Sequence, residues 1–153
     1  MRKKILAVLG LCVMVVSMLS VSASAAEIQP FNNVDKPYLF EFFTPWQDDL
    51  RQYKKENTSS VYINSQVFPG NYYIYTNGLV GGKWEDCTQR DAVVPGTGEY
   101  LIYNTIMEDY RAHGGTGYTY ARLGAFKATL LIGETASGVW SPDSVGSYPH
   151  INP

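Results

Sequence analysis

Aromatic side chains are the residues of this sequence best suited to bind a ligand by surface contact. The chain carries 12 tyrosines, 6 phenylalanines and 3 tryptophans among 153 residues. Flat rings can stack on sugar rings, and they also fill the cores of small proteins. Both uses stay open, and exposure to solvent decides between them. The candidate binding side chains are Trp84, Tyr73, Tyr75 and Trp140.

The local sequence indicates how each candidate is oriented. Tyr73 and Tyr75 stand two residues apart in an expected strand, so their side chains share one face. Trp84 lies between Gly81-Gly82-Lys83 and Glu85-Asp86, which indicates an exposed ring. Trp140 precedes a Ser-Pro-Asp-Ser turn, and there it would close one end of the fold.

Acidic residues occur as adjacent pairs at 48–49, 85–86 and 108–109. Hydrolysis of a glycosidic bond uses two carboxyl groups, roughly 5–10 Å apart, that face the same bond. Neighbours on a strand point to opposite faces, so none of these pairs meets that requirement alone. Two carboxylates drawn from different pairs would meet it. The alternative is that these residues are solvated charges at turns and strand edges.

Cys87 is the only cysteine left once the N-terminal segment that contains Cys12 is removed. As a nucleophile it would need His113 within hydrogen-bonding reach. The acidic neighbours Glu85 and Asp86 would raise the pKa of the thiol and work against that role. Burial as a small apolar side chain is the alternative.

Metal and cofactor motifs are not visible. The two histidines, His113 and His150, have no ligand spacing with Cys87, and no DxDxDG calcium loop occurs. The glycine-rich stretch 114–117 has no following lysine, so it reads as a turn and not as a phosphate loop. We therefore expect no metal, no cofactor and no catalytic residue.

The first 25 residues have the pattern of a secretory signal peptide. Basic residues at 2–4 precede an apolar run at 5–19, and Ala23-Ser24-Ala25 fits a small-x-small cleavage site. An uncleaved membrane anchor is the alternative, but it needs roughly 20 apolar residues. We expect cleavage after Ala25, a secreted protein, and no membrane span after cleavage.

Removal of that segment changes the charge of the chain. The formal net charge is −2. The mature part keeps nine basic and fourteen acidic residues, so its net charge is −5. An acidic surface argues against nucleic-acid binding, which depends on contacts with phosphates.

The sequence pattern of the mature chain is typical of an all-β protein. Short apolar and aromatic segments recur every 10–12 residues between glycine and proline turns, and Asn77-Gly78 and Gly81-Gly82 are among those turns. We expect a flexible leader at 26–37 and one domain at 38–153, an antiparallel β-sandwich of about eight short strands with at most one short helix. The expected strands are 38–43, 61–68, 71–76, 88–94, 99–107, 118–123 and 127–132.

Residues 44–57 are the place where local rules predict that helix. Thr44 and Gln47 have the spacing of a capping box. Trp46, Leu50 and Tyr53 follow a helical spacing and would form one apolar stripe.

Three fragments of the chain resemble a known group of proteins. They are Thr58 to Tyr62, Tyr118 to Leu123 and Gly138 to Ser144. With the leader, they resemble small exported proteins of Gram-positive bacteria and, more remotely, the lactococcin family of bacteriocins. The resemblance implies a small β-sandwich without catalytic residues, and it implies a strand before Thr58 in place of the helix.

We therefore expect a secreted, monomeric, non-enzymatic binding or bacteriocin-like module that acts at a bacterial cell surface or wall. Its partner would be a cell-wall polymer or a surface receptor. A carbohydrate-binding module or small carbohydrate-active enzyme is the first alternative, and a structural component of the envelope is the second.

Overall fold

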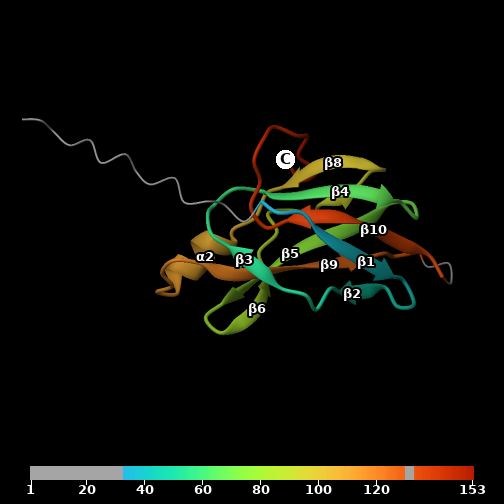
Figure 1. Ribbon diagram of the computed structural model, residues 1–153. Helices are drawn as coiled ribbons and strands as arrows, with labels where there is room; N and C mark the ends of the chain where they lie inside the picture. Colours follow the sequence, from blue (N-terminus) through green and yellow to red (C-terminus); the bar gives the residue numbers. More distant parts are fainter. Residues whose placement is uncertain (1–32, 130–132) are drawn as a thin grey trace, which may run out of the picture. The chain divides into compact units, whose positions relative to one another are not determined.

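The computed structural model describes residues 33–129 and 133–153. The expected signal peptide at 1–25 and residues 26–32 of the expected leader lie outside this part of the chain. Within it, ten strands form two antiparallel sheets that pack together (Figure 1), and one short helix completes the fold. The predicted all-β sandwich is confirmed. None of the described helices is long and apolar enough to cross a membrane.

The first sheet has four strands in the order β1-β10-β4-β8. Trp140 of β10 pairs with Lys36 of β1 on one side and with Ile63 of β4 on the other. The bounds of these strands are β1 Lys36–Glu41, β10 Thr135–Ser141, β4 Val61–Val67 and β8 Gly98–Ile102.

The second sheet has six strands, with β2-β9-β5-β6 as its main path. Two short strands complete it, because β3 pairs with β9 and β7 pairs with β5. The bounds are β2 Trp46–Asp48, β3 Tyr53–Lys55, β5 Tyr72–Val80, β6 Lys83–Asp86, β7 Val93–Val94 and β9 Thr119–Phe126.

The core lies between the inner faces of the two sheets. Residues of β5 alternate between buried and half-buried along its whole length, so one face packs inward and the other is open to solvent. Phe40, Ile63, Ile74, Leu123 and Trp140 are among the buried side chains that meet in the core.

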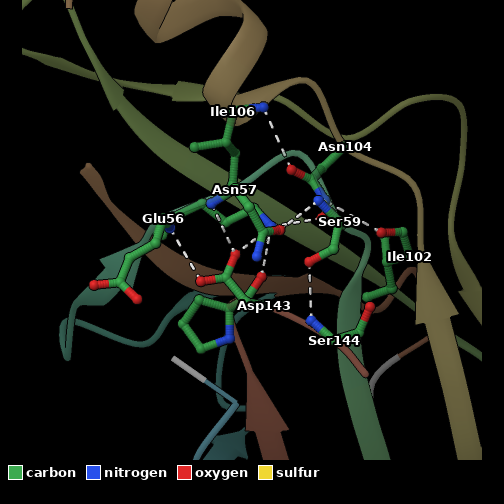
Figure 2. A network of polar contacts seen from close by, with 10 residues as sticks. Glu56, Asn57, Ser59, Ile102, Asn104, Ile106, Asp143 and Ser144 are labelled. Carbon is green, nitrogen blue, oxygen red and sulfur yellow. Dashed lines mark hydrogen bonds and ion pairs between the residues drawn. The ribbon is translucent and has the colours of Figure 1, made fainter. Parts of the chain in front are cut away.

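A buried ion pair ties the second sheet to the chain that leaves the first. Lys55 of β3 and Asp143, which follows β10, have fully buried side chains. Lys55 Nζ also donates to the carbonyls of Ser59 and Pro142. The Asp143 carboxylate accepts hydrogen bonds from the backbone N–H groups of Glu56 and Asn57 (Figure 2).

The same network brings two of the resembling fragments together. The backbone N–H of Ser144 donates to Ser59 Oγ (Figure 2). Tyr62 of the first fragment pairs with Ser141 of the last fragment across β4 and β10. These fragments therefore build the junction between the sheets.

The helix predicted at 44–57 is wrong. Residues 46–48 and 53–55 form β2 and β3, and both strands pair with β9. The expected side-chain contact does form, because Gln47 Nε2 donates to Thr44 Oγ1 at 3.0 Å, but it closes a turn. Pairing with β9 supplies backbone hydrogen bonds that a short helix would otherwise make within itself.

The helix lies instead at Ile106–Ala112, labelled α2, and it begins within the last two residues of the strand expected at 99–107. β8 ends at Ile102, and Thr105 precedes the helix. Acidic Glu108 and Asp109 lie in its first turn, where the helix dipole favours them.

Three other expectations about the strands are corrected. Asn77-Gly78 is no turn: β5 continues to Val80, and the chain reverses at Gly81-Gly82. Gly78 suits this strand because an added Cβ would lie 2.9 Å from Ile106 Cγ2.

Of the strand expected at 88–94, only β7 forms. Residues 127–129 are not in a strand, and 130–132 lie outside the described residues.

Strand β10 is an element that the sequence pattern did not predict. A bulge at Ser137/Gly138 shifts the register of its pairing with β4. Only glycine fits at Gly138, because a Cβ there would overlap the Asn64 carbonyl oxygen.

Candidate functional site

The outer face of the second sheet gathers aromatic side chains from four strands. Tyr73 of β5 pairs with Phe126 of β9, which pairs in turn with Trp46 of β2. Tyr75 follows Tyr73 on the same face, and Trp84 of β6 lies opposite Leu79 of β5. We call these five residues, Trp46, Tyr73, Tyr75, Trp84 and Phe126, the aromatic face.

Trp46 is the most exposed ring of this face, with 65% of its surface open to solvent. Its indole stacks on Tyr75 with centroids 5.4 Å apart and an interplanar angle of 22°. It also contacts Phe126 at 4.5 Å, and Phe126 lies 5.9 Å from Tyr73. These neighbours hold the orientation of Trp46 while its surface stays accessible.

Two hollows flank Trp46 and Tyr75. The first, of about 180 Å³, is lined also by Asp48, Asn77 and Asp86. The second, of about 290 Å³, is lined also by Tyr73, Asp91, Phe126 and Ala128. Each hollow therefore combines aromatic walls with at least one carboxylate.

Gly124 keeps the first hollow open. It pairs with Tyr75 on one side and with Asp48 on the other. A Cβ at this position would lie 2.8 Å from Asp48 Oδ1 and 3.1 Å from Asn77 Nδ2. The absence of a side chain at Gly124 thus leaves room between these polar groups.

Two donors on this face have no hydrogen-bond partner among the described residues. They are the Tyr75 hydroxyl and Arg122 Nε, and both atoms are buried. Burial raises the pKa of Tyr75 above its ordinary value of 10.0, and the nearby carboxylates of Asp86, Asp91 and Asp48 raise it further. The Tyr75 hydroxyl therefore stays protonated and can donate a hydrogen bond.

Arg122 ties the centre of the face together. Its guanidinium lies 4.5 Å from the centroid of the Trp84 ring and 3.7 Å from Asp48 Oδ2. Trp84 is consequently half-buried, and the most exposed tryptophan is Trp46 instead of Trp84. Because burying an unpaired charge is costly, an arginine in an otherwise apolar strand needs partners such as Asp48 and the Trp84 ring.

Of the four predicted binding residues, Tyr73, Tyr75 and Trp84 share the aromatic face, and Trp140 does not. Trp140 is fully buried in the core, where it meets Tyr53 edge-on at 5.6 Å. It has no surface to offer a ligand, because β10 runs between β1 and β4 and its inward face packs against the other sheet.

The thiol of Cys87 is not arranged for catalysis. Burial raises its pKa from 9.0 to about 12, with a smaller contribution from Asp109. Its hydrogen-bond acceptor is the Glu85 carbonyl, whereas His113 Nδ1 contacts the Asp109 carbonyl. The thiol is therefore protonated at neutral pH and is a poor nucleophile.

The described residues contain no group of three or more metal-binding side chains that could hold an ion. They do contain a polar cleft of about 210 Å³ beside the first sheet, lined in part by Asp35, Tyr62 and Glu99. The Tyr62 hydroxyl already donates to Glu99 Oε1 at 2.6 Å. Tyr62 and Glu99 therefore satisfy each other within this cleft.

Sequence reasoning missed the roles of Phe126 and Gly124 in the site. The helix expected at 44–57 places Trp46 in an apolar stripe and gives no indication that this residue lies beside β9. Alternation on β9 could have indicated the face, because Tyr120, Arg122 and Phe126 fall on the same side.

A comparison with protein families gives one finding. A model described as "Protein of unknown function (DUF2712)" matches residues 21–144, which include all three resembling fragments. Neither the curated proteins nor the solved structures contain a match to this sequence. Because the family model spans most of the chain, this protein belongs to the DUF2712 family.

Proposed function

We propose that this protein is a non-enzymatic carbohydrate-binding module that acts at a bacterial cell surface or wall through its aromatic face. The observation that carries the proposal is the exposed Trp46 ring, held by Tyr75 and Phe126 beside a hollow that Asp48, Asn77 and Asp86 also line. A rigid, exposed ring presents a large contact area at little cost in conformational entropy.

The polar groups of the face support the same proposal. Sugars present hydroxyl groups around an apolar ring face, so their binding sites need acceptors and donors beside an aromatic surface. Asp48 and Asp86 line the hollow and accept hydrogen bonds. The Tyr75 hydroxyl and Arg122 Nε are donors without a hydrogen-bond partner among the described residues.

The place of action is part of the proposal. Residues 1–25 have the pattern of a signal peptide, and the resembling proteins are exported. We expect the protein in the culture medium or wall fraction, with Ala26 as its first residue. An N-terminal sequence that still contains residues 1–25 would contradict export by cleavage.

Retention on insoluble polysaccharides tests the binding. The mature protein is incubated with peptidoglycan, chitin and cellulose, and the unbound fraction is measured against an acidic protein of similar size. We expect retention on at least one polymer and its loss in Trp46→Ala. Tyr103→Ala is the matched control, because Tyr103 is also exposed but follows β8 of the other sheet. Absence of retention on all three polymers contradicts the proposal.

Hydrolysis is the second candidate, because Asp48 and Asp86 come from separate strands and line one hollow. Two carboxylates that face one bond are the requirement of a glycosidase. Asp48 is already engaged by Arg122, whose guanidinium lies 3.7 Å from Asp48 Oδ2. Release of reducing ends from the retaining polymer, abolished in Asp86→Asn, would establish hydrolysis; retention without release supports binding alone.

Bacteriocin-like action, which the lactococcin resemblance implies, would use the same face against the wall of competing cells. Growth of Gram-positive indicator strains with the mature protein tests it. Inhibition by the wild type, lost in Trp46→Ala and kept in Tyr103→Ala, supports this role. Equal inhibition by both variants contradicts it.

A further inference from the structure

Aromatic residues continue along β9 beyond the aromatic face. Tyr120 lies on the same side of the strand as Arg122 and Phe126, because side chains alternate. Tyr118, which precedes β9, meets Tyr120 edge-on at 5.7 Å and is 42% exposed. The Lys54 ammonium lies 4.3 Å from the centroid of the Tyr118 ring and supports that side chain.

Tyr118 and Tyr120 line a third hollow of about 530 Å³. It lies at the start of β9, between the end of α2 and the turn that joins β5 to β6. The Tyr110 hydroxyl donates to the Thr116 carbonyl and fixes the glycine-rich turn at one wall. The other lining residues include Leu79, His113 and Thr116.

The spacing along β9 separates the hollows. Phe126 and Tyr120 stand six residues apart, which corresponds to about 20 Å along an antiparallel strand. This length is greater than one or two sugar rings. Arg122, which lies over Trp84, is between Phe126 and Tyr120 on β9. Its guanidinium could contact a sugar chain that runs along this strand.

The charge of this surface restricts the ligand. Asp48, Asp86 and Asp91 line the hollows beside Trp46. The cation between them, Arg122, is already paired with Asp48. At the Trp46 end of this surface, phosphate-bearing or uronate-bearing polymers would bring like charges together, whereas uncharged sugars and amino sugars would not.

From these observations we infer that the aromatic face and the Tyr118–Tyr120 hollow form one continuous platform for an extended, uncharged or amine-bearing polysaccharide chain. The chain lies along β9 and is bound through internal units. This inference rests on the proposed function, and it adds the length and charge class of the ligand.

Titration calorimetry with chito-oligosaccharides from disaccharide to hexasaccharide tests the length. We expect affinity to rise about tenfold across the series, as one further aromatic contact would supply. Tyr120→Ala should remove that gain with chain length. Tyr120→Phe, which keeps the ring, should restore the gain, and Tyr103→Ala should not alter it.

The outcomes separate the inference from the proposed function. Binding that is flat with chain length, or a Tyr120→Ala variant that weakens all lengths equally, contradicts the platform but leaves sugar binding by Trp46 intact. Absence of binding to any chito-oligosaccharide, together with absence of retention on the insoluble polymers, overturns both.

A second set of titrations tests the charge class. Glucosamine oligomers should bind at least as tightly as N-acetylglucosamine oligomers at low salt. Any gain in affinity from their amino groups should fall as added salt screens the carboxylates of the protein. Hyaluronate oligomers of equal length should bind more weakly than either. Tighter binding of hyaluronate would contradict the assigned charge class.

Discussion

Lys55 Nζ lies 3.0 Å from Asp143 Oδ1, and neither side chain is exposed to solvent. Burial lowers the pKa of Lys55, and the charge of Asp143 opposes that effect. All three ammonium protons have acceptors, namely Asp143 and the carbonyls of Ser59 and Pro142. The pair therefore links β3 of one sheet to the chain after β10 of the other without an unsatisfied charge.

Removal of one member of this pair should destabilise the fold strongly. Asp143→Ala leaves a buried ammonium without its counter-charge, and we expect the free energy of unfolding to fall by about 3–5 kcal/mol. Urea unfolding followed by tryptophan fluorescence measures the loss. Asp91→Ala, at an exposed position, should change stability by less than about 0.5 kcal/mol.

The double variant Lys55→Met/Asp143→Leu tests whether the loss of stability in Asp143→Ala comes from the unpaired charge of Lys55. Apolar side chains of similar volume remove both charges, so its stability should lie above that of Asp143→Ala. A double variant that is less stable than the single one would show that the role of Asp143 does not depend on Lys55.

Filling the hollow above Gly124 should impair ligand binding more than folding. In Gly124→Ala the new methyl group would lie 2.8 Å from Asp48 Oδ1 and 3.2 Å from Tyr75 Cδ2, so the Asp48 side chain must shift. We expect retention on the binding polysaccharide to fall in the same pull-down assay. Gly96→Ala is the matched control, since its nearest contact would be 4.0 Å away. Equal retention of the two variants would contradict the placement of the site.

Cys87 should be inert in the folded protein. Burial raises the pKa of its thiol to about 12, so almost no thiolate exists at neutral or mildly alkaline pH. Reaction with a disulfide reagent should therefore be slow in native buffer and rapid in denaturant. Fast labelling of the native protein would contradict both the burial and the protonated state of the thiol.

Stability should fall at alkaline pH. In the folded state the pKa of Cys87 is raised from 9.0 to about 12, and the pKa values of Tyr62, Tyr72 and Tyr75 are raised above 10.0. Groups with raised pKa values stabilise the fold fully below their unfolded pKa, and this contribution is lost as the pH rises toward the folded value. Melting temperatures from about pH 8 to about pH 11 should therefore decline progressively.

The Cys87→Ala variant is the control for the decline of the melting temperature with pH. Cys87→Ala removes one of the buried groups, so its melting temperature should fall less steeply above about pH 9 than that of the wild type. Tyrosine absorbance recorded in parallel should show ionisation that coincides with unfolding. A melting temperature that is constant across this range would contradict the raised pKa values.

The fold class was predictable because the strands alternate clearly and are separated by glycine and proline turns. Tyr73 and Tyr75 were correctly placed on one face for the same reason. Local rules failed at residues 44–57, where the pairing of Trp46 with Phe126 and of Lys54 with Tyr120 outweighed the helical spacing. Such pairings join residues about 70 positions apart and leave no signal in a short window.

The candidate site was predictable only in part, because exposure depends on which strands become neighbours. Trp84 has a polar sequence environment, yet Arg122 covers it from β9. Trp140 lies beside a turn, yet its strand runs through the first sheet and its ring faces the core. Trp46 has the local spacing of a buried helical residue and is instead the most exposed of the three tryptophans.

The measurement that tests the central claim most directly is an NMR titration of the protein, labelled in its aromatic rings, with chitohexaose. The ring signals of Trp46, Tyr73, Tyr75 and Phe126 should shift most, followed by those of Tyr120. Tyr62 and Tyr148, whose rings contact each other beside the polar cleft of the first sheet, should stay unchanged. Largest shifts at Tyr62 and Tyr148, or no shift at Trp46, would contradict the assignment of ligand binding to the aromatic face.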